Sequence, residues 1–316
     1  MSKSIPTVSR RALVGSALLL GGARAPLARA RDDTSLWDIY RVTLRRAKYI
    51  DLTHAMAPGG PIGEGFADFK VGPARAGVSI PGVIREGQPF DYAKLGVAIT
   101  AYDLPMDHIG TQFGPPAHMN DHGATISDIP PTVTLRPLAV VNIAPKVAVD
   151  PGYQASLADV KDWERRHGPI PAGSVVMIRS DWSKKWHEPH RFTRQPFPGV
   201  RLAALEYLHL RRRILMHGHE PLDTDNTAPR FVGETWLLKH NFAQAEGVAN
   251  LDQVPEAGAL IAIGFAKFEG GTGGFARYIA IAPPEWPHGS TIEEAPGAPL
   301  PTHARALRRG PDGVLK

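Results

Sequence analysis

The sequence contains no cysteine in its 316 residues. This absence excludes a disulfide framework and any zinc site built on thiolates, so the fold has to be stabilised by an ordinary apolar core. The sequence also lacks the G-x-S-x-G motif of serine hydrolases, the P-loop of nucleotide hydrolases and the G-x-G-x-x-G motif of dinucleotide-binding enzymes. These three classes of enzyme are therefore not indicated.

Long apolar runs are also scarce, and the most informative one lies at the N-terminus. A Ser-Arg-Arg start at residues 9–11 is followed by an apolar run at residues 12–20 and an Ala-Arg-Ala end at residues 28–30. This order predicts a twin-arginine signal peptide over residues 1–30, with export to the periplasm or the cell exterior. The apolar run is too short to cross a bilayer, so no membrane association is expected after cleavage of the leader.

An excess of positive charge is absent from the predicted mature chain. The full sequence has 36 Lys and Arg against 31 Asp and Glu, and 36 minus the 5 basic residues of the leader leaves 31. Those five residues are Lys3, Arg10, Arg11, Arg24 and Arg29. With no clustered basic run either, the sequence does not indicate a nucleic-acid partner.

The residues beyond the leader predict one α/β domain with a mixed sheet, over residues 31–283, followed by a Pro-rich tail at residues 284–316. Residues 57–92 are rich in glycine and proline and are expected to be irregular, as a binding loop or as a surface insertion. Apolar periodicity predicts strands at residues 49–53, 138–143, 174–179, 214–217, 259–265 and 277–282. It predicts helices at residues 36–46, 157–167 and 202–212.

Two histidines ten residues apart, His108 and His118, bracket a turn-rich loop that holds Gln112 and Gly114. A loop stiffened by glycine and proline can hold imidazole and amide groups so that they converge on a metal ion. The same residues can equally be hydrogen-bonded loop residues, because this spacing alone is a weak signal.

The segment reads H-x-G-T-Q-x-G-x-P-x-H and resembles the H-x-G-T-H-x-D-x-P-x-H signature of the cyclase family of metal-dependent hydrolases, which includes bacterial kynurenine formamidase and isatin hydrolase. The resemblance extends in order over residues 48–283. Further similar segments lie at residues 51–54, 197–199, 219–225, 246–251 and 270–277. The resemblance implies a swivelling β/β/α fold, a homodimer or homotetramer, and hydrolysis of a C–N bond in a small amide, either an arylformamide or a cyclic amide.

The resemblance also implies roles for residues that match the family pattern. His108 corresponds to the first metal ligand, His118 to the catalytic histidine and Glu246 to a late glutamate of the site. Glu246 is thus expected both as a metal ligand and as a catalytic residue.

Three positions depart from the pattern. Gln112 replaces a ligating histidine, Gly114 replaces a ligating aspartate, and Glu234 stands where a late histidine is expected, twelve residues before Glu246. Amide oxygen binds zinc less well than imidazole does, and glycine offers no side-chain ligand at all.

These departures leave two interpretations open. In the first, His108, Gln112, Glu234 and Glu246 bind a divalent metal, manganese or zinc, with an oxygen-rich set that suits manganese better. Asp121 or His122, in the continuing loop, is then a candidate replacement for the missing ligand. In the second, the metal is lost and the protein binds a small molecule without converting it.

Overall fold

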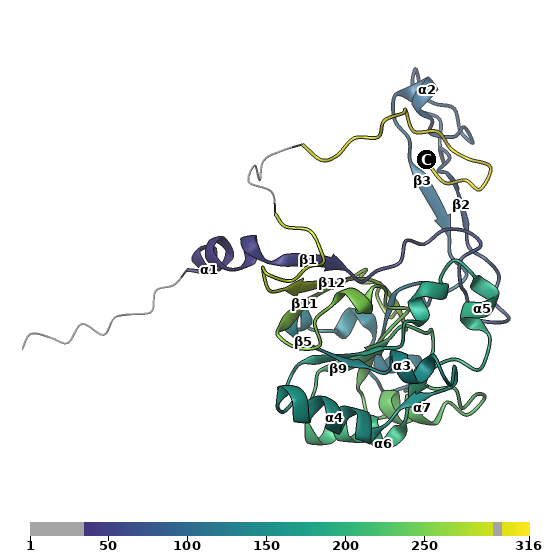
Figure 1. The fold of residues 1–316 in the computed structure, drawn as a ribbon. Coiled ribbons are helices and arrows are strands. Elements are labelled where there is room, and N and C mark those ends of the chain that lie inside the picture. Colours follow the sequence, from purple (N-terminus) through teal and green to yellow (C-terminus); the bar gives the residue numbers. More distant parts are fainter. Residues whose placement is uncertain (1–34, 293–298) are drawn as a thin grey trace, which may run out of the picture.

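The computed structural model describes residues 35–292 and 299–316, so the predicted leader lies outside the described residues. Its main feature is an eight-stranded sheet with the order β1-β12-β11-β5-β7-β9-β10-β4 (Figure 1). An additional pairing of β12 with β4 closes seven of these strands into a barrel. The strands are β1 (Lys48–Asp51), β4 (Gln112–Gly114), β5 (Leu135–Asn142), β7 (Val175–Arg179), β9 (Met216–His219), β10 (Ala243–Glu246), β11 (Ala259–Phe265) and β12 (Gly274–Ala282).

The sheet is mixed, as the sequence predicts. Strands β5, β7, β9 and β10 pair in parallel, whereas β1, β12, β11 and β4 form antiparallel pairs with their neighbours. Strand β7 is an almost continuous apolar run because a parallel strand of this kind is covered on both faces. The predicted strand at residues 259–265 has the bounds of β11, and the other predicted strands differ from the observed ones by a few residues.

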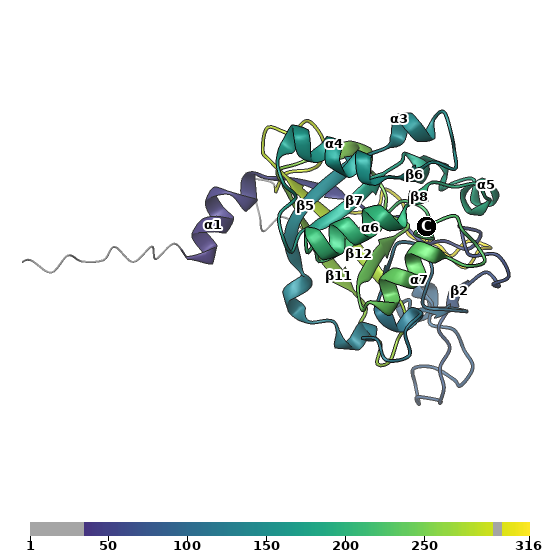
Figure 2. The same ribbon diagram turned by 90° about the horizontal axis from the view of Figure 1, so that it is seen from below.

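Seven α-helices accompany the sheet in the described residues. They are α1 (Leu36–Val42), α2 (Tyr92–Leu95), α3 (Ala144–Val147), α4 (Leu157–His167), α5 (Pro189–Thr193), α6 (Leu202–Glu206) and α7 (Val232–Lys239). Single 3₁₀ turns occupy residues 44–46, 116–118, 126–128, 131–133, 182–185 and 251–253. Helices α4, α6 and α7 lie together on one side of the sheet (Figures 1 and 2). No helix within the described ranges is both long and apolar enough to cross a bilayer.

Helix α4 begins where the sequence predicts it. Ser156 caps its first turn, and the side chains and backbones of Ser156 and Asp159 form a reciprocal capping box. The predicted helix over residues 202–212 is interrupted, since α6 ends at Glu206 and a π-helical turn covers Tyr207–Arg211. Hydrophobic periodicity does not distinguish an α-helical turn from a π-helical one, so the sequence predicts one regular helix there.

Two apolar cores lie on opposite faces of the barrel wall. Val175 and Met177 of β7 belong to a cluster to which every strand of the closed ring contributes, so this cluster is the barrel interior. Val176 and Ile178, which alternate with them, pack in a second cluster with residues of α4 and α6. On β4 and β10 it follows that Phe113 and Ala245 face the interior, whereas residues 112, 114, 244 and 246 face the helix side.

The segment at residues 57–103 is more ordered than the sequence predicts. Strand β2 (Lys70–Pro73) pairs with β3 (Thr100–Asp103) in an antiparallel arm that projects from the body (Figure 1). The expectation of an irregular stretch over residues 57–92 is therefore wrong for residues 70–73. A short parallel pair, β6 (Gln154–Ala155) with β8 (Gly199–Val200), lies beside the main sheet.

Candidate active site

A buried network of amide and carboxyl groups lies between the sheet and α7. The side-chain Nε2 of Gln112 donates to Glu246 Oε2 at 2.6 Å. The Nε2 of Gln244 donates to Glu246 Oε1 at 2.8 Å and to Glu234 Oε1 at 2.9 Å. The backbone N–H of Thr224 donates to Glu234 Oε2 at 3.3 Å, so each of the four carboxyl oxygens accepts a hydrogen bond.

The network continues through the hydroxyl of Thr224. This hydroxyl lies 2.6 Å from Gln244 Oε1, 2.9 Å from His219 Nε2 and 3.2 Å from His217 Nε2. All four side chains are buried. The network therefore joins the end of β9 to β10 and α7 through polar contacts.

Burial keeps the two carboxyl groups of the network neutral. It raises the pKa of Glu234 to about 8, and the nearby carboxyl of Asp223 adds to this shift. Burial also raises the pKa of Glu246 well above its usual range, with a further contribution from Glu234. Because the hydrogen bonds come from neutral amides, the network contains no cation that would favour the ionised carboxylates.

A second polar group is the pair His108 and His118, whose ring centroids lie 4.0 Å apart. The Nε2 of His108 is buried and has no hydrogen-bond partner. Burial lowers the pKa of His108 to about 4, with a contribution from His118, and burial lowers the pKa of His118 as well. Both imidazoles are therefore neutral at pH 7, and a neutral imidazole can accept a proton from water.

Asp107 lies beside this pair, with its Oδ1 3.6 Å from His108 Nε2. Its Oδ2 accepts the backbone N–H groups of Thr272 and Gly273, both at 2.8 Å. Burial raises the pKa of Asp107, but the Gly273 N–H and the neighbouring His108 more than offset that effect and leave the pKa lowered. A Cβ atom at Gly273 would lie 2.8 Å from His108 Nε2, so the glycine allows the backbone to approach the imidazole.

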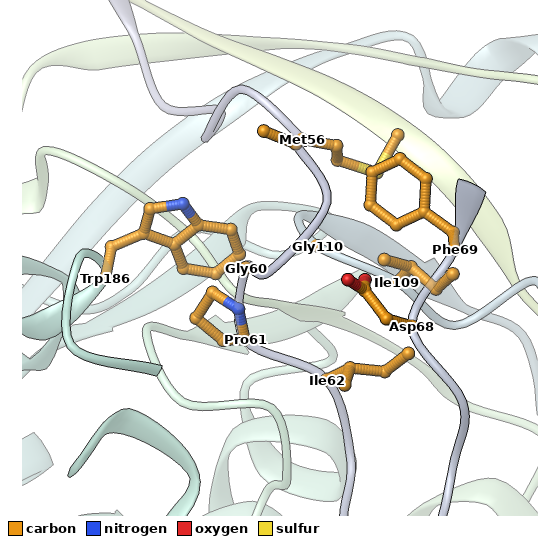
Figure 3. Close-up of a pocket in the computed structure, with 10 residues that line it drawn as sticks. Met56, Gly60, Pro61, Ile62, Asp68, Phe69, Ile109, Gly110 and Trp186 are labelled. Carbon is orange, nitrogen blue, oxygen red and sulfur yellow. The ribbon is translucent and has the colours of Figure 1, made fainter. Parts of the chain in front are cut away.

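A small apolar pocket is lined in part by Ile109 and Gly110, the two residues that follow His108 in the chain (Figure 3). It is a hollow of about 230 Å³, part of it open to solvent, and the aromatic ring of Trp186 forms one side. Ile109, which follows His108 in the chain, forms part of its wall. The lining residues are Met56, Ala57, Gly60, Pro61, Ile62, Asp68, Phe69, Ile109, Gly110 and Trp186.

The ring of Trp186 stacks on His54, with centroids 3.9 Å apart and an interplanar angle of 2°. Burial lowers the pKa of His54 to about 4, with a contribution from His187, and its Nε2 is buried without a partner. The structure places Trp186 in the pocket wall and His54 directly behind it.

Glu220 fixes the segment that carries Trp186. Its carboxylate accepts the backbone N–H of Ser180 at 3.0 Å and that of Trp182 at 2.7 Å, and it also accepts the hydroxyls of Ser180 and Ser183. Burial raises the pKa of Glu220 despite these hydrogen bonds. Sequence reasoning missed this residue because its partners lie about 40 positions away, on the neighbouring strand end.

The predicted site residues therefore fall into two groups. Gln112, Glu234 and Glu246 are brought together in the network, whereas His108 lies against His118. No hydrogen bond between the two groups is present in the described part of the chain. The two candidate replacement ligands, Asp121 and His122, are exposed on the surface and lie in neither group.

As arranged, these residues do not fit a divalent metal ion. Across residues 35–292 and 299–316, no three His, Cys, Asp or Glu side chains gather as a metal ion requires. The Nε2 of Gln112 is directed at Glu246, and the space beside Gly114 is filled by Gln244, whose Cγ lies 2.9 Å from the position of a Cβ at Gly114. Among the predicted metal ligands, which all lie in the described residues, two neutral atoms remain without partners, His108 Nε2 and Gln112 Oε1, and two are too few for a closed shell.

Comparisons with known proteins agree on a family. A model of the putative cyclase family matches residues 50–226, which is more than half of the chain. Isatin hydrolase from Roseibium aggregatum is 31% identical over 191 residues, covering 56% of this chain and 72% of that protein.

Solved structures have the same fold. Isatin hydrolase A from Ralstonia solanacearum superposes with a TM-score of 0.67 at 25% identity, over 78% of this chain and 97% of that one. A structure described as a potential metal-dependent hydrolase with cyclase activity superposes with a TM-score of 0.54 at 20% identity, over 74% and 98% of the two chains, a likeness of fold alone.

Proposed function

Since this chain belongs to the cyclase family, we propose that it is a hydrolase that cleaves the C–N bond of a small amide, either an arylformamide or a cyclic amide. The observation that carries the proposal is the pair of neutral imidazoles, His108 and His118, whose ring centroids lie 4.0 Å apart, next in the chain to Ile109 and Gly110 of an apolar pocket. A neutral base next to a small hollow with few polar groups is an arrangement expected for hydrolysis of an uncharged substrate.

The walls of the pocket support a flat, aromatic substrate. Trp186 and Phe69 offer aromatic surface, and the parallel stack of Trp186 on His54 holds the indole ring in one orientation. The name of the curated relative, isatin hydrolase, indicates a bicyclic amide as the substrate of that protein. The mainly apolar lining of this hollow matches a substrate of the same class in polarity.

In the proposed reaction, His118 takes a proton from a water molecule while the water oxygen attacks the amide carbonyl carbon. The C–N bond then breaks, and the leaving nitrogen receives a proton from the imidazolium or from Glu246, whose pKa burial raises well above its usual range. If Glu246 donates the proton, the imidazolium returns its own proton to the Glu246 carboxylate. A carboxylic acid and an amine result, on one molecule if the amide was cyclic. The carboxylate of Asp107, next to His108, stabilises the positive charge while the proton is held.

A divalent metal is not part of this scheme, because the arrangement of Gln112, Gly114 and Gln244 does not fit one. That misfit favours a second candidate function, in which the protein binds a small amide in the same pocket without hydrolysing it. The two functions share the pocket and differ in turnover.

The assembly and location of the protein are further proposals. We propose a homodimer or homotetramer, supported by the apolar side chains that α1 exposes, with Trp37 87% and Leu36 80% exposed. The helix stands away from the body in both ribbon views (Figures 1 and 2). Location in the periplasm is proposed from the leader sequence alone.

Turnover of formanilide and isatin by the purified protein tests the function. We expect His118→Ala to lower kcat about 100-fold or more, because general acid–base catalysis contributes a factor of this size. His122→Ala, four residues further along on the exposed surface, is the matched control and should keep full activity. Binding of either compound without turnover by the wild-type protein would instead support the second candidate function.

A further inference from the structure

We infer that Gln244 has taken the volume that an aspartate side chain at position 114 would need, so that an amide–carboxyl network occupies the place of a metal shell. The inference goes beyond the proposed hydrolysis and does not depend on it. It rests on the contacts of Gly114, Gln244 and Gln112.

Gly114 is not required by its backbone conformation. It lies in strand β4 and is not among the residues with a positive φ, so any residue could adopt its backbone angles. Its Cβ position, however, lies 2.9 Å from Gln244 Cγ and 3.4 Å from Gln244 Nε2. The two residues face each other directly, because Gln244 is the register partner of Gly114 between β10 and β4.

Gln244 cannot simply move aside to make room. Its side chain is fully buried, and its amide is used on both ends. Nε2 donates to Glu234 and Glu246, and Oε1 lies 2.6 Å from the Thr224 hydroxyl. Displacing it would leave two buried carboxyl groups each short of a hydrogen bond.

Gln112 completes the replacement. Its Nε2 donates to the second oxygen of Glu246, so the two glutamines together satisfy this carboxyl group. The Glu246 carboxyl group is thereby satisfied by hydrogen bonds from amide N–H groups, whereas in a metal site a cation would neutralise its charge. An aspartate at position 114 would add a third carboxyl group beside Glu234 and Glu246 without adding any donor.

Restoring a metal site therefore requires three substitutions together. We expect the wild-type protein, purified without chelator, to contain far less than one metal per chain, and its Tm to stay unchanged on addition of MnCl₂ or ZnCl₂. The double variant Gln112→His/Gly114→Asp should lose stability and still bind little metal. The triple variant Gln112→His/Gly114→Asp/Gln244→Ala should approach one metal per chain and gain in Tm with either salt.

Two results would overturn the inference. One is near-stoichiometric metal in the wild-type protein that is lost in His108→Ala. The other is a double variant that binds metal as well as the triple variant does, which would show that Gln244 is not the obstacle.

A second measurement covers the case in which the larger variants do not fold. Gly114→Ala should lower Tm in the wild-type background, because the added Cβ meets Gln244, and should have little effect on Tm in a Gln244→Ala background. Equal losses in both backgrounds would also overturn the inference. Metal content and Tm do not depend on turnover, so failure of the inference is distinguishable from failure of the proposed hydrolysis.

Discussion

The two polar groups of the site differ in how completely their atoms are paired. In the network of Gln112, Gln244, Glu234 and Glu246, each carboxyl oxygen accepts a hydrogen bond. Beside the pocket, by contrast, His108 has a buried Nε2 with no partner. Among the glutamine and glutamate side chains of the network, Gln112 Oε1 is the one atom without a partner. Paired carboxyl groups hold a structure together, whereas an unpaired imidazole nitrogen is free to take part in a reaction.

The difference between the two polar groups follows the match of their residues to the family signature. His108 and His118 match the family signature and lie outside the network, and His108 keeps an unpaired buried Nε2. Gln112 and Gly114 depart from the signature, and both belong to the paired network or its packing. The departures therefore have a structural consequence in the network and leave the histidine pair intact.

The largest effect is expected from breaking the network. Glu246→Ala would leave the amides of Gln112 and Gln244 without a shared acceptor and open a cavity, at a cost of about 3 kcal/mol in the free energy of unfolding. Glu246→Gln keeps the shape and replaces one neutral group by another, so it should cost about 1 kcal/mol or less. Urea denaturation measures both. Equal losses of stability in Glu246→Ala and Glu246→Gln would mean that the carboxyl group of Glu246 is ionised in the wild-type protein. The network would then resemble a charged, ion-binding site more than its hydrogen bonds indicate.

The second effect concerns a histidine that has no catalytic role. His209 is buried against Phe242, with both ring nitrogens unpartnered, and burial lowers its pKa to about 3. The neutral form is therefore favoured in the folded state, and the unfolded chain binds the proton more readily below pH 6.5. Stability from this group is present above pH 6.5 and is lost as the pH falls toward 3, with a loss on the order of 3 kcal/mol by pH 4.

His209→Phe should flatten this acid loss of stability and leave kcat unchanged, which separates a packed histidine from the pair at the pocket. Unfolding free energies at pH 7, 5 and 4 provide the measurement, with the wild-type protein alongside. A variant whose acid sensitivity equals that of the wild type would show that His209 is not the group responsible.

Much of the fold is predictable from local patterns in the sequence. The Ser156 cap and the alternating residues of β11 depend on neighbours within a few positions, so their elements are found with nearly correct bounds. The β2–β3 pairing depends on segments about 30 residues apart within a Gly- and Pro-rich stretch, and no local signal reveals it.

The residues of the site also divide into those that a local sequence pattern identifies and those that it does not. The motif identifies His108, His118, Gln112 and Gly114, because these residues lie within one short segment. Gln244 lies 130 residues beyond Gly114 and becomes its neighbour only through the register of β10 with β4. A residue that replaces a missing side chain from across a sheet can be identified only once that register is known.

The smallest effect tests how closely the backbone must approach the histidine pair. A methyl group at Gly273 would lie 2.8 Å from His108 Nε2 and 2.7 Å from the Asp107 carbonyl oxygen, so Gly273→Ala should displace the imidazole. If His108 orients His118 in the reaction, kcat/KM should fall about 10-fold, equivalent to about 1.4 kcal/mol. Gly264→Ala is the control, because only one atom lies within 4 Å of the Cβ position there, at 4.0 Å. Assays of amide hydrolysis with both variants decide the matter, since equal activity would mean that the position of His108 does not affect the chemistry.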